Sequence, residues 1–192
     1  TERANDLREI VSPFILRRKK EDVAKDLPEK EEIILYSEMD RKQKKIYDTY
    51  QIETRQKIEE AINKNGIGGS AIVILEAMLK LRQICLFPEL VSPEYKSAGS
   101  CKFDALQDML DEIISEGHKV LLFSQFVKTL KIIEKHLKLN GVSYAYLDGS
   151  TRNRKKVIDA FQQDGDKKIF LLSIKAGGVG INLTAADYVI LF

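Results

Sequence analysis

Apolar residues follow two different periods in the second half of the chain. In three stretches, which begin at Ser100, Val127 and Val157, apolar residues recur every three or four positions. This spacing predicts amphipathic helices. Short, largely apolar runs stand between and after these stretches, at 119–123, 144–147, 168–172 and 187–192. Such runs are typical of strands buried on both faces. Strands that alternate with helices predict an α/β fold with a parallel sheet flanked by helices.

The region 40–98 carries a helical pattern instead. Asp40 is expected to cap a helix, with Gln43 three residues on as in a capping box, and Gly66 is expected to end that helix. A second helix over about 70–86 is apolar nearly all round. A helix of that kind has to be buried by other elements.

The region before residue 40 is less regular. A short apolar-periodic segment breaks at Pro13, and the basic run 17–20 follows it. Residues 31–36 include a run of β-branched, apolar and aromatic residues that predicts a strand. The acidic pair 21–22 directly follows the basic run, so a solvated face of mixed charge explains that run better than contact with DNA does.

Composition indicates a globular protein but does not identify its binding partner. The chain has 192 residues, 44% hydrophobic and 31% charged, with a net charge of +2. This is ordinary for a globular protein, and no apolar run approaches the roughly 20 residues that span a bilayer. A nearly neutral chain binds nucleic acid only through local clusters of cations.

Cysteine and histidine usage predicts neither disulfide nor metal chemistry. Cys85 and Cys101 are expected to be free thiols in a reducing compartment. His118 and His136 have no second ligand at metal spacing, so no metal ligands are expected. No Ser/His/Asp or Cys/His nucleophilic set has a supporting pattern either.

Ligands of parallel sheets bind in the loops at the carboxyl ends of the strands. Three such loops here are rich in glycine, hydroxyl and amide residues, with cations close by: 124–125, 148–151 and 173–182, with Arg152, Arg154 and Lys175. Backbone N–H groups, helix N-termini and cations are what phosphate oxygens require. For any one loop taken alone, a tight turn with a helix cap is an equally good interpretation.

The glycine-rich loop 177–180 matches neither common nucleotide-binding motif. Leu183 stands where a dinucleotide fingerprint needs its third glycine, and no Gly-Lys-Ser/Thr follows as in a Walker A loop. A Walker A loop is absent from the whole chain. The acidic pair 111–112 lies inside a predicted helix and is expected to face solvent.

Six segments, taken in order, resemble the Swi/Snf-type ATPases of helicase superfamily two. They are Pro13-Phe14-Ile15-Leu16-Arg17-Arg18-Lys19 through Lys30, Leu81-Arg82-Gln83-Ile84-Cys85 with Pro88, Ser100-Cys101-Lys102, Val120 through Phe126, Leu147-Asp148-Gly149-Ser150-Thr151, and Leu172 through Asp187. Each segment is modestly specific, whereas six in the right order are highly so. Together they cover essentially the whole chain.

The resemblance implies two RecA-like lobes that clamp ATP and walk along one strand of duplex DNA. It assigns 1–39 to the end of the first lobe and the interlobe segment, 40–98 to a helical protrusion, and 99–192 to the second RecA-like lobe. The last strand stops at Phe192, so we expect this second lobe to be incomplete at its C-terminus.

The resemblance also implies two sets of site residues. The first set would touch the DNA backbone: Ser124, Gln125, Lys175, Ala176 and Gly177, with Thr151 and Arg154 on the same surface. The second set would link DNA contact to the nucleotide cleft: Gly178, Gly180 and Asn182. Neither set includes a catalytic residue.

Other parts expected of the family are missing from this sequence. The Walker A lysine and the acidic pair of the first lobe are absent, and the sixth motif, whose arginine would reach the γ-phosphate, should follow Phe192. Those groups stabilise phosphoryl transfer. We therefore expect ATP and Mg²⁺ to bind the intact protein, with neither bound to this chain alone, and we expect this chain alone not to hydrolyse ATP.

The resemblance implies partners and a location as well. The expected partners are the duplex DNA backbone and the first ATPase lobe of the same polypeptide, with no membrane. Whether the target is naked DNA, nucleosomes or DNA bound by RNA polymerase is left open. The expected location is intracellular: the nucleus of a eukaryote, or the cytoplasm or nucleoid of a prokaryote.

Two alternative functions stay open on the sequence. One is a lobe of a related RNA helicase, against which the Leu-Arg-Arg and Gly-Gly-Val-Gly-Ile-Asn-Leu segments argue. The other is a non-catalytic module that binds a protein partner through its helical protrusion.

Overall fold

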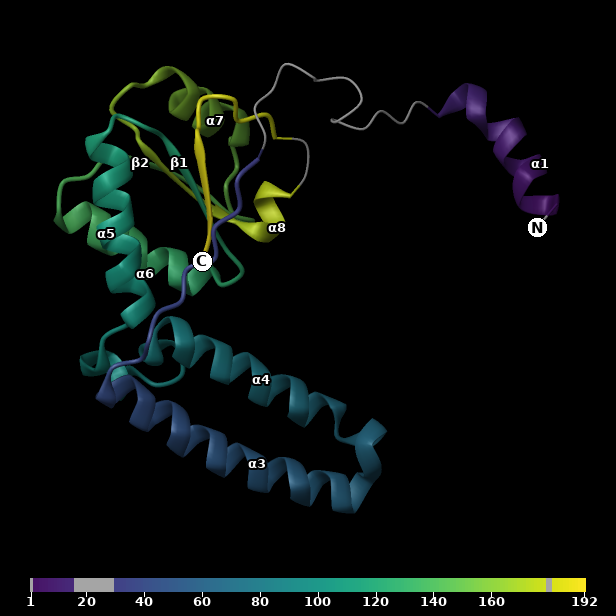
Figure 1. Ribbon diagram of the computed structural model, residues 1–192, viewed down its shortest axis with the longest axis vertical. Helices are drawn as coiled ribbons and strands as arrows, with labels where there is room; N and C mark the ends of the chain where they lie inside the picture. Colours follow the sequence, from purple (N-terminus) through teal and green to yellow (C-terminus); the bar gives the residue numbers. More distant parts are fainter. Residues whose placement is uncertain (1, 16–29, 179–180) are drawn as a thin grey trace. The chain divides into compact units, whose positions relative to one another are not determined.

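The computed structural model describes residues 2–15, 30–178 and 181–192 (Figure 1). The chain divides into two compact units, 1–36 and 37–192, and each is described by itself. No helix in the described ranges is long and apolar enough to cross a membrane.

The first unit contains helix α1 (Glu2–Val11) and the 3₁₀ helix η1 (Ser12–Phe14), which has Pro13 in its first turn. The strand predicted at 31–36 is wrong, because residues 30–36 form neither helix nor strand. A strand needs a neighbour that pairs with its backbone groups, and no described strand pairs with this segment. Its side chains are exposed, up to 91% at Tyr36. The basic run 17–20 lies outside the described residues.

The second unit begins with a helical hairpin made of α3 (Arg41–Gly69) and α4 (Ala71–Leu86). The predicted cap is confirmed, because Asp40 Oδ1 accepts a hydrogen bond from the Gln43 backbone N–H at 2.6 Å. The Gln43 side chain does not complete a capping box. It is fully buried. Its Nε2 donates to the backbone carbonyl of Ile84 near the C-terminus of α4, and its Oε1 accepts from the backbone N–H of Cys101, where the following helix begins.

Helical geometry breaks at Gly66, as predicted, where φ is 70° and ψ is 174°. That φ lies in the left-handed region, which glycine enters without steric cost. One further turn then carries the chain to Gly69 before α4 begins.

The expectation that α4 is buried all round is wrong. Its large apolar side chains are exposed along much of its length, with Ile72 at 80%, Leu75 at 65% and Met78 at 55%. In a two-helix hairpin each helix can cover only one side of the other, and Figure 1 shows α4 packed beside α3 and otherwise free over most of its length. Only its last turns enter the core, where Ile84 and Leu86 are buried.

Two short 3₁₀ helices, η2 (Pro88–Leu90) and η3 (Pro93–Ala98), lead into an alternation of helices and strands. The elements are α5 (Cys101–Ser115), β1 (Val120–Ser124), α6 (Val127–Leu139), β2 (Tyr144–Leu147), α7 (Arg154–Gln163), β3 (Ile169–Ser173), α8 (Ile174–Gly177) and β4 (Tyr188–Leu191). The four strands form one sheet in the order β2-β3-β1-β4, with every pair parallel. The predicted parallel sheet is therefore confirmed.

Helices cover both faces of this sheet, and the alternation of side chains along each strand divides the core accordingly. Val120 and Leu122 pack with α5 and α6 on one face, whereas Leu121 packs with α7 and α8 on the other. Figure 1 shows the two pairs of helices on opposite sides of the strands. The acidic pair 111–112 is exposed on α5, as predicted.

Candidate nucleic-acid interface

Three loops meet at one edge of the sheet. Ser124 at the end of β1 is in register with Ser173 at the end of β3, and Leu147 at the end of β2 is in register with Leu172. The strand order places β3 between β2 and β1. The loop after β3, which carries Lys175, therefore lies between the loops that follow the other two strands.

The loop after β2 is organised by the buried carboxylate of Asp148. Its Oδ1 accepts hydrogen bonds from the backbone N–H and the hydroxyl of Ser150, at 2.8 and 2.6 Å. Its Oδ2 accepts one from the Tyr146 hydroxyl at 2.9 Å. The bond from the Ser150 hydroxyl is the main cause that lowers the pKa of Asp148. This negative charge is thus satisfied inside the protein and shapes the turn.

Thr151 closes the same turn. Its Oγ1 accepts a hydrogen bond from the Asp148 backbone N–H at 3.1 Å. A hydroxyl has one hydrogen to donate in addition to its acceptor sites. The Thr151 hydroxyl can therefore donate outward to a phosphate oxygen while it still supports the turn.

The loop after β3 turns directly into the short helix α8. The buried Ser173 hydroxyl caps it, accepting from the Ala176 N–H at 3.3 Å. The Ala176 carbonyl accepts a hydrogen bond from Arg154 Nη2, which ties the start of α7 to α8. Lys175, between these two buried positions, is exposed.

Gly177 brings this loop against β1. A Cβ at Gly177 would overlap Cε1 of the Phe123 ring and lie 3.3 Å from its Cδ1. Any larger residue would have to displace that ring. The close approach of α8 to β1 therefore depends on glycine at this position.

Two of the residues predicted to contact DNA are buried in the structure. Ser124 is 0% exposed, and its Oγ accepts a hydrogen bond from the Phe126 N–H at 3.3 Å. Ala176 is also buried, and both of its backbone polar groups are already bonded, to Ser173 and Arg154. Both residues shape the loops, and neither presents a side chain to a ligand.

Gln125 is exposed at the end of β1. Its Oε1 accepts a hydrogen bond at 2.7 Å from Nη2 of Arg82, which lies in the last turns of α4. Arg82 belongs to the Leu-Arg-Gln-Ile-Cys segment, but no pattern in the sequence indicates that it reaches this loop.

The predicted nucleotide-cleft residues are only partly described. Gly178 and Asn182 are exposed, and Gly180 lies outside the described residues. Gln162 on α7 holds the segment that contains Asn182, since its Nε2 donates to the Asn182 carbonyl at 3.3 Å and its Oε1 accepts from the Ala185 N–H at 2.9 Å. The sequence offered no signal for this role of Gln162.

Cations outnumber accessible acids around these loops. Six exposed cations carry no ion pair within the described ranges: Arg82, Arg152, Arg154, Lys155, Lys156 and Lys175. The acid of the loop after β2, Asp148, is buried and hydrogen-bonded, and Asp159 on α7 is half-buried and forms no ion pair with a described residue. The edge therefore presents uncompensated positive charge, although the net charge of the chain is only +2.

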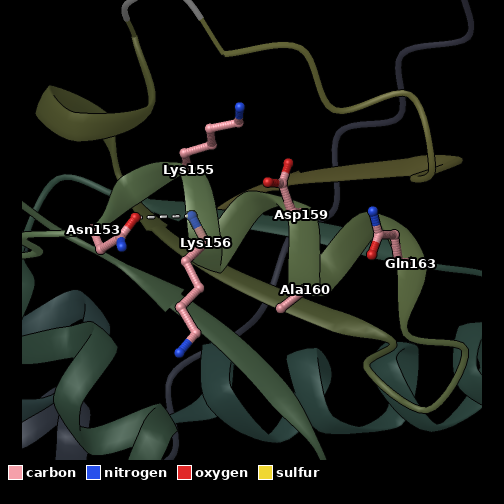
Figure 2. A pocket seen from close by; sticks show the side chains of 6 residues that line it. All are labelled: Asn153, Lys155, Lys156, Asp159, Ala160 and Gln163. Carbon is pink, nitrogen blue, oxygen red and sulfur yellow. Dashed lines mark hydrogen bonds between the residues drawn. The ribbon is translucent and has the colours of Figure 1, made fainter.

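A hollow of about 450 Å³ lies along α7 and not over the strand ends. Figure 2 shows its lining residues, with Lys155 and Lys156 extending in different directions from the helix. Asn153 caps the helix by accepting from the Lys156 N–H at 3.1 Å (Figure 2). Because the hollow collects none of the three loops, we do not place the site there.

No group of three or more His, Cys, Asp or Glu side chains that could hold a metal ion occurs in the described part of the chain. Both cysteines are free thiols, as expected. His118 bonds to Asp187, and His136 to Gln107 and Asn140.

Two family descriptions match the chain. The SNF2-related domain matches residues 1–90, and the helicase conserved C-terminal domain matches residues 101–192. The chromatin remodeling factor mit1 of Schizosaccharomyces pombe is 34% identical over 100% of this chain and 15% of its own length. Across three curated relatives, the chain spans between 15% and 26% of their length.

Solved structures agree with these matches. The C-terminal domain of the Sulfolobus solfataricus SWI2/SNF2 ATPase is 31% identical, with a TM-score of 0.67 over 82% of this chain and 69% of that one. The core of the same ATPase in complex with dsDNA is 32% identical, with a TM-score of 0.71 over 97% of this chain and 40% of that one. The sheet and its helices thus form a RecA-like lobe, and the chain belongs to the Swi/Snf-type ATPases of helicase superfamily two.

Proposed function

We propose that the edge formed by the three loops binds the sugar–phosphate backbone of duplex DNA in an ATP-driven translocase. The observation that carries the proposal is the meeting of three donor-rich loops, with Arg82, Arg152, Arg154 and Lys175 exposed on or beside them and without ion pairs in the described ranges. The structure of the archaeal relative with dsDNA supports the choice of ligand.

Each proposed contact uses a donor on an exposed or partly exposed residue. Lys175 and Arg152 supply charge, the Thr151 hydroxyl supplies its hydrogen, and the Gln125 amide supplies N–H groups. The partly exposed backbone at Gly177 can approach a DNA strand, because no side chain intervenes. Donors of this kind meet phosphate oxygens without reading bases, so binding should be independent of sequence and steeply dependent on salt.

Arg154 supports this surface in a second way. One of its guanidinium nitrogens bonds to the Ala176 carbonyl, while the side chain remains exposed. A guanidinium has five donors in a fixed plane. Arg154 can therefore hold α8 in place and still meet a phosphate.

We also propose that the intact protein hydrolyses ATP and couples it to movement along DNA. Gly178, Gly180 and Asn182 would border the nucleotide cleft, next to the DNA-binding loop. The division into interlobe segment 1–39, protrusion 40–98 and second lobe 99–192 belongs to this proposal. The described residues do not fit a Mg²⁺ site of their own, so Mg²⁺ and most ATP contacts are assigned to other parts of the intact protein.

The relative named as a chromatin remodeling factor favours nucleosomal DNA over DNA bound by RNA polymerase as the target. We propose nucleosomal DNA accordingly, with the nucleus as the location in a eukaryote.

Lys175→Ala tests the DNA surface. Loss of one phosphate contact should weaken binding to a 30-base-pair duplex about fivefold to tenfold near 0.1 M salt. It should also reduce the slope of log K against log salt by about 0.9, because one counterion fewer is released. Fluorescence anisotropy of labelled duplex across a salt series measures both quantities.

Lys64→Ala is the matched control, since Lys64 is an exposed lysine near the far end of α3 and should leave both quantities unchanged. Equal losses for Lys64→Ala and Lys175→Ala would contradict a localised surface. Stronger competition by single-stranded RNA than by unlabelled duplex would point to the RNA-helicase alternative.

A further inference from the structure

The hydrogen bond from Arg82 Nη2 to Gln125 Oε1 joins residues 43 positions apart in the sequence, one on α4 and one in the loop after β1. We infer that Arg82 is a positioning residue for DNA binding: it orients the Gln125 carboxamide so that its NH₂ group faces the phosphate backbone. This inference rests on the proposed DNA-binding function and assigns a role to the end of the helical hairpin.

The chemistry of the two side chains determines which end of the amide faces Arg82. A guanidinium only donates hydrogen bonds, whereas a carboxamide accepts at its oxygen and donates at its nitrogen. The atom that meets Arg82 must therefore be Oε1. Nε2 is left without a partner in the described residues and is free to donate elsewhere.

Phosphate oxygens only accept, so the orientation of this amide decides whether it attracts or repels DNA. A freely rotating Gln125 would present its oxygen to the phosphate for part of the time, and would lose side-chain entropy on binding. With Oε1 held by Arg82, the two N–H groups are preorganised, and the bond to a cation further polarises the amide.

Arg82 can act in this way because the backbone beneath it is held in place. The Ile84 carbonyl accepts a hydrogen bond from Gln43 Nε2 at 2.8 Å, and the Leu86 carbonyl accepts one from the Ser100 hydroxyl. Ile84 and Phe87 are buried in the core. The last turn of α4 is thus anchored to the core by hydrogen bonds and buried side chains, in contrast to its exposed N-terminal turns.

Arg82 carries charge as well, and forms no ion pair with any described residue. The two possible roles of Arg82, as a charge that meets DNA and as a contact that orients Gln125, predict different effects of substitution on DNA affinity. A charge that meets DNA independently contributes the same factor whether or not Gln125 is present. An orienting contact contributes only through Gln125.

A double-mutant cycle separates the two roles. Binding to the 30-base-pair duplex is measured by anisotropy for the unchanged chain, Arg82→Met, Gln125→Ala and the double variant. Each single change should weaken binding about threefold to tenfold, the scale of one lost phosphate contact. The affinity of the double variant should lie within about twofold of that of the weaker-binding single variant, because both changes remove the same contact.

Arg55→Met is the matched control, since Arg55 is an exposed arginine on α3 that pairs with Glu59, and it should leave affinity unchanged. Thermal unfolding verifies that the variants fold. The side-chain NH₂ resonances of Gln125 should shift in Arg82→Met without any DNA, which reports the contact directly.

Two results would overturn the inference while the proposed function stands: multiplicative losses in the double variant, or normal binding by Arg82→Met while Lys175→Ala binds weakly. If Lys175→Ala and Gln125→Ala both bind normally, the proposed interface itself is wrong, and the inference with it.

Discussion

At the scale of single residues, Gln43 shows how one buried amide can join three helices. Its Nε2 donates to the Ile84 carbonyl at the end of α4, and its Oε1 accepts from the Cys101 N–H at the start of α5. The side chain comes from the first turn of α3 and is 0% exposed. Burying an amide is favourable only when its polar atoms are bonded, and here both ends are.

Gln43→Leu should therefore destabilise the chain by about 2–4 kcal/mol, because it leaves a buried carbonyl and a buried N–H unpaired at about 1–3 kcal/mol each. Urea unfolding followed by circular dichroism measures the change. Gln51→Leu, at an exposed position on the same helix, should change stability by no more than about 0.5 kcal/mol. Equal effects of the two substitutions would show that the Gln43 bonds contribute nothing.

At the scale of elements, the packing of α8 against β1 depends on the missing side chain of Gly177. The Phe123 ring occupies the space where a Cβ would lie. This contact sets the distance between the loop that carries Lys175 and the strand that ends beside Gln125. The spacing of the proposed DNA contacts thus depends on a glycine that makes no polar contact itself.

Gly177→Ala should cost about 1–3 kcal/mol, the usual cost of overpacking, and should weaken duplex binding although no donor is removed. Phe123→Ala in the same chain should restore part of the binding by freeing the space. Gly165→Ala is the control, because nothing lies within 4 Å of a Cβ there and the residue lies outside the three loops. Wild-type stability and affinity in Gly177→Ala would contradict the close approach.

At the scale of the whole molecule, the proposed DNA contact and ATP hydrolysis depend on different groups. The lobe carries the three loops proposed to bind phosphate, but its sequence has no Walker A loop, and its described residues contain no group of three or more His, Cys, Asp or Glu side chains that could hold a metal ion. Phosphoryl transfer requires cations to stabilise charge on the transferred group. The proposed DNA contact requires only the loops at the edge of the sheet.

We therefore expect this chain to bind duplex DNA without hydrolysing ATP. Phosphate release in the presence of Mg²⁺ and ATP should stay at the level of a protein-free blank, with and without saturating duplex. DNA-stimulated turnover by this chain, retained through a second purification step, would contradict the expectation.

The same scales separate what could be predicted from what could not. The Asp40 cap, the break at Gly66 and the four strands of the sheet follow from local patterns, and the structure confirms all three. The exposure of Leu75 was not predictable, because burial depends on how many neighbours surround a helix. A helix with one neighbour leaves its other sides in water.

The sequence by itself determined the alternation of helices and strands, the donor-rich composition of the strand-end loops and the membership of the family, because each of these is encoded in short stretches of neighbouring residues. Only the tertiary structure decided that Gln43 bonds across three helices, that Ser124 is buried, and that Arg82 meets Gln125. Those contacts join positions about 40 or more apart, so their geometry exists only once the chain has folded.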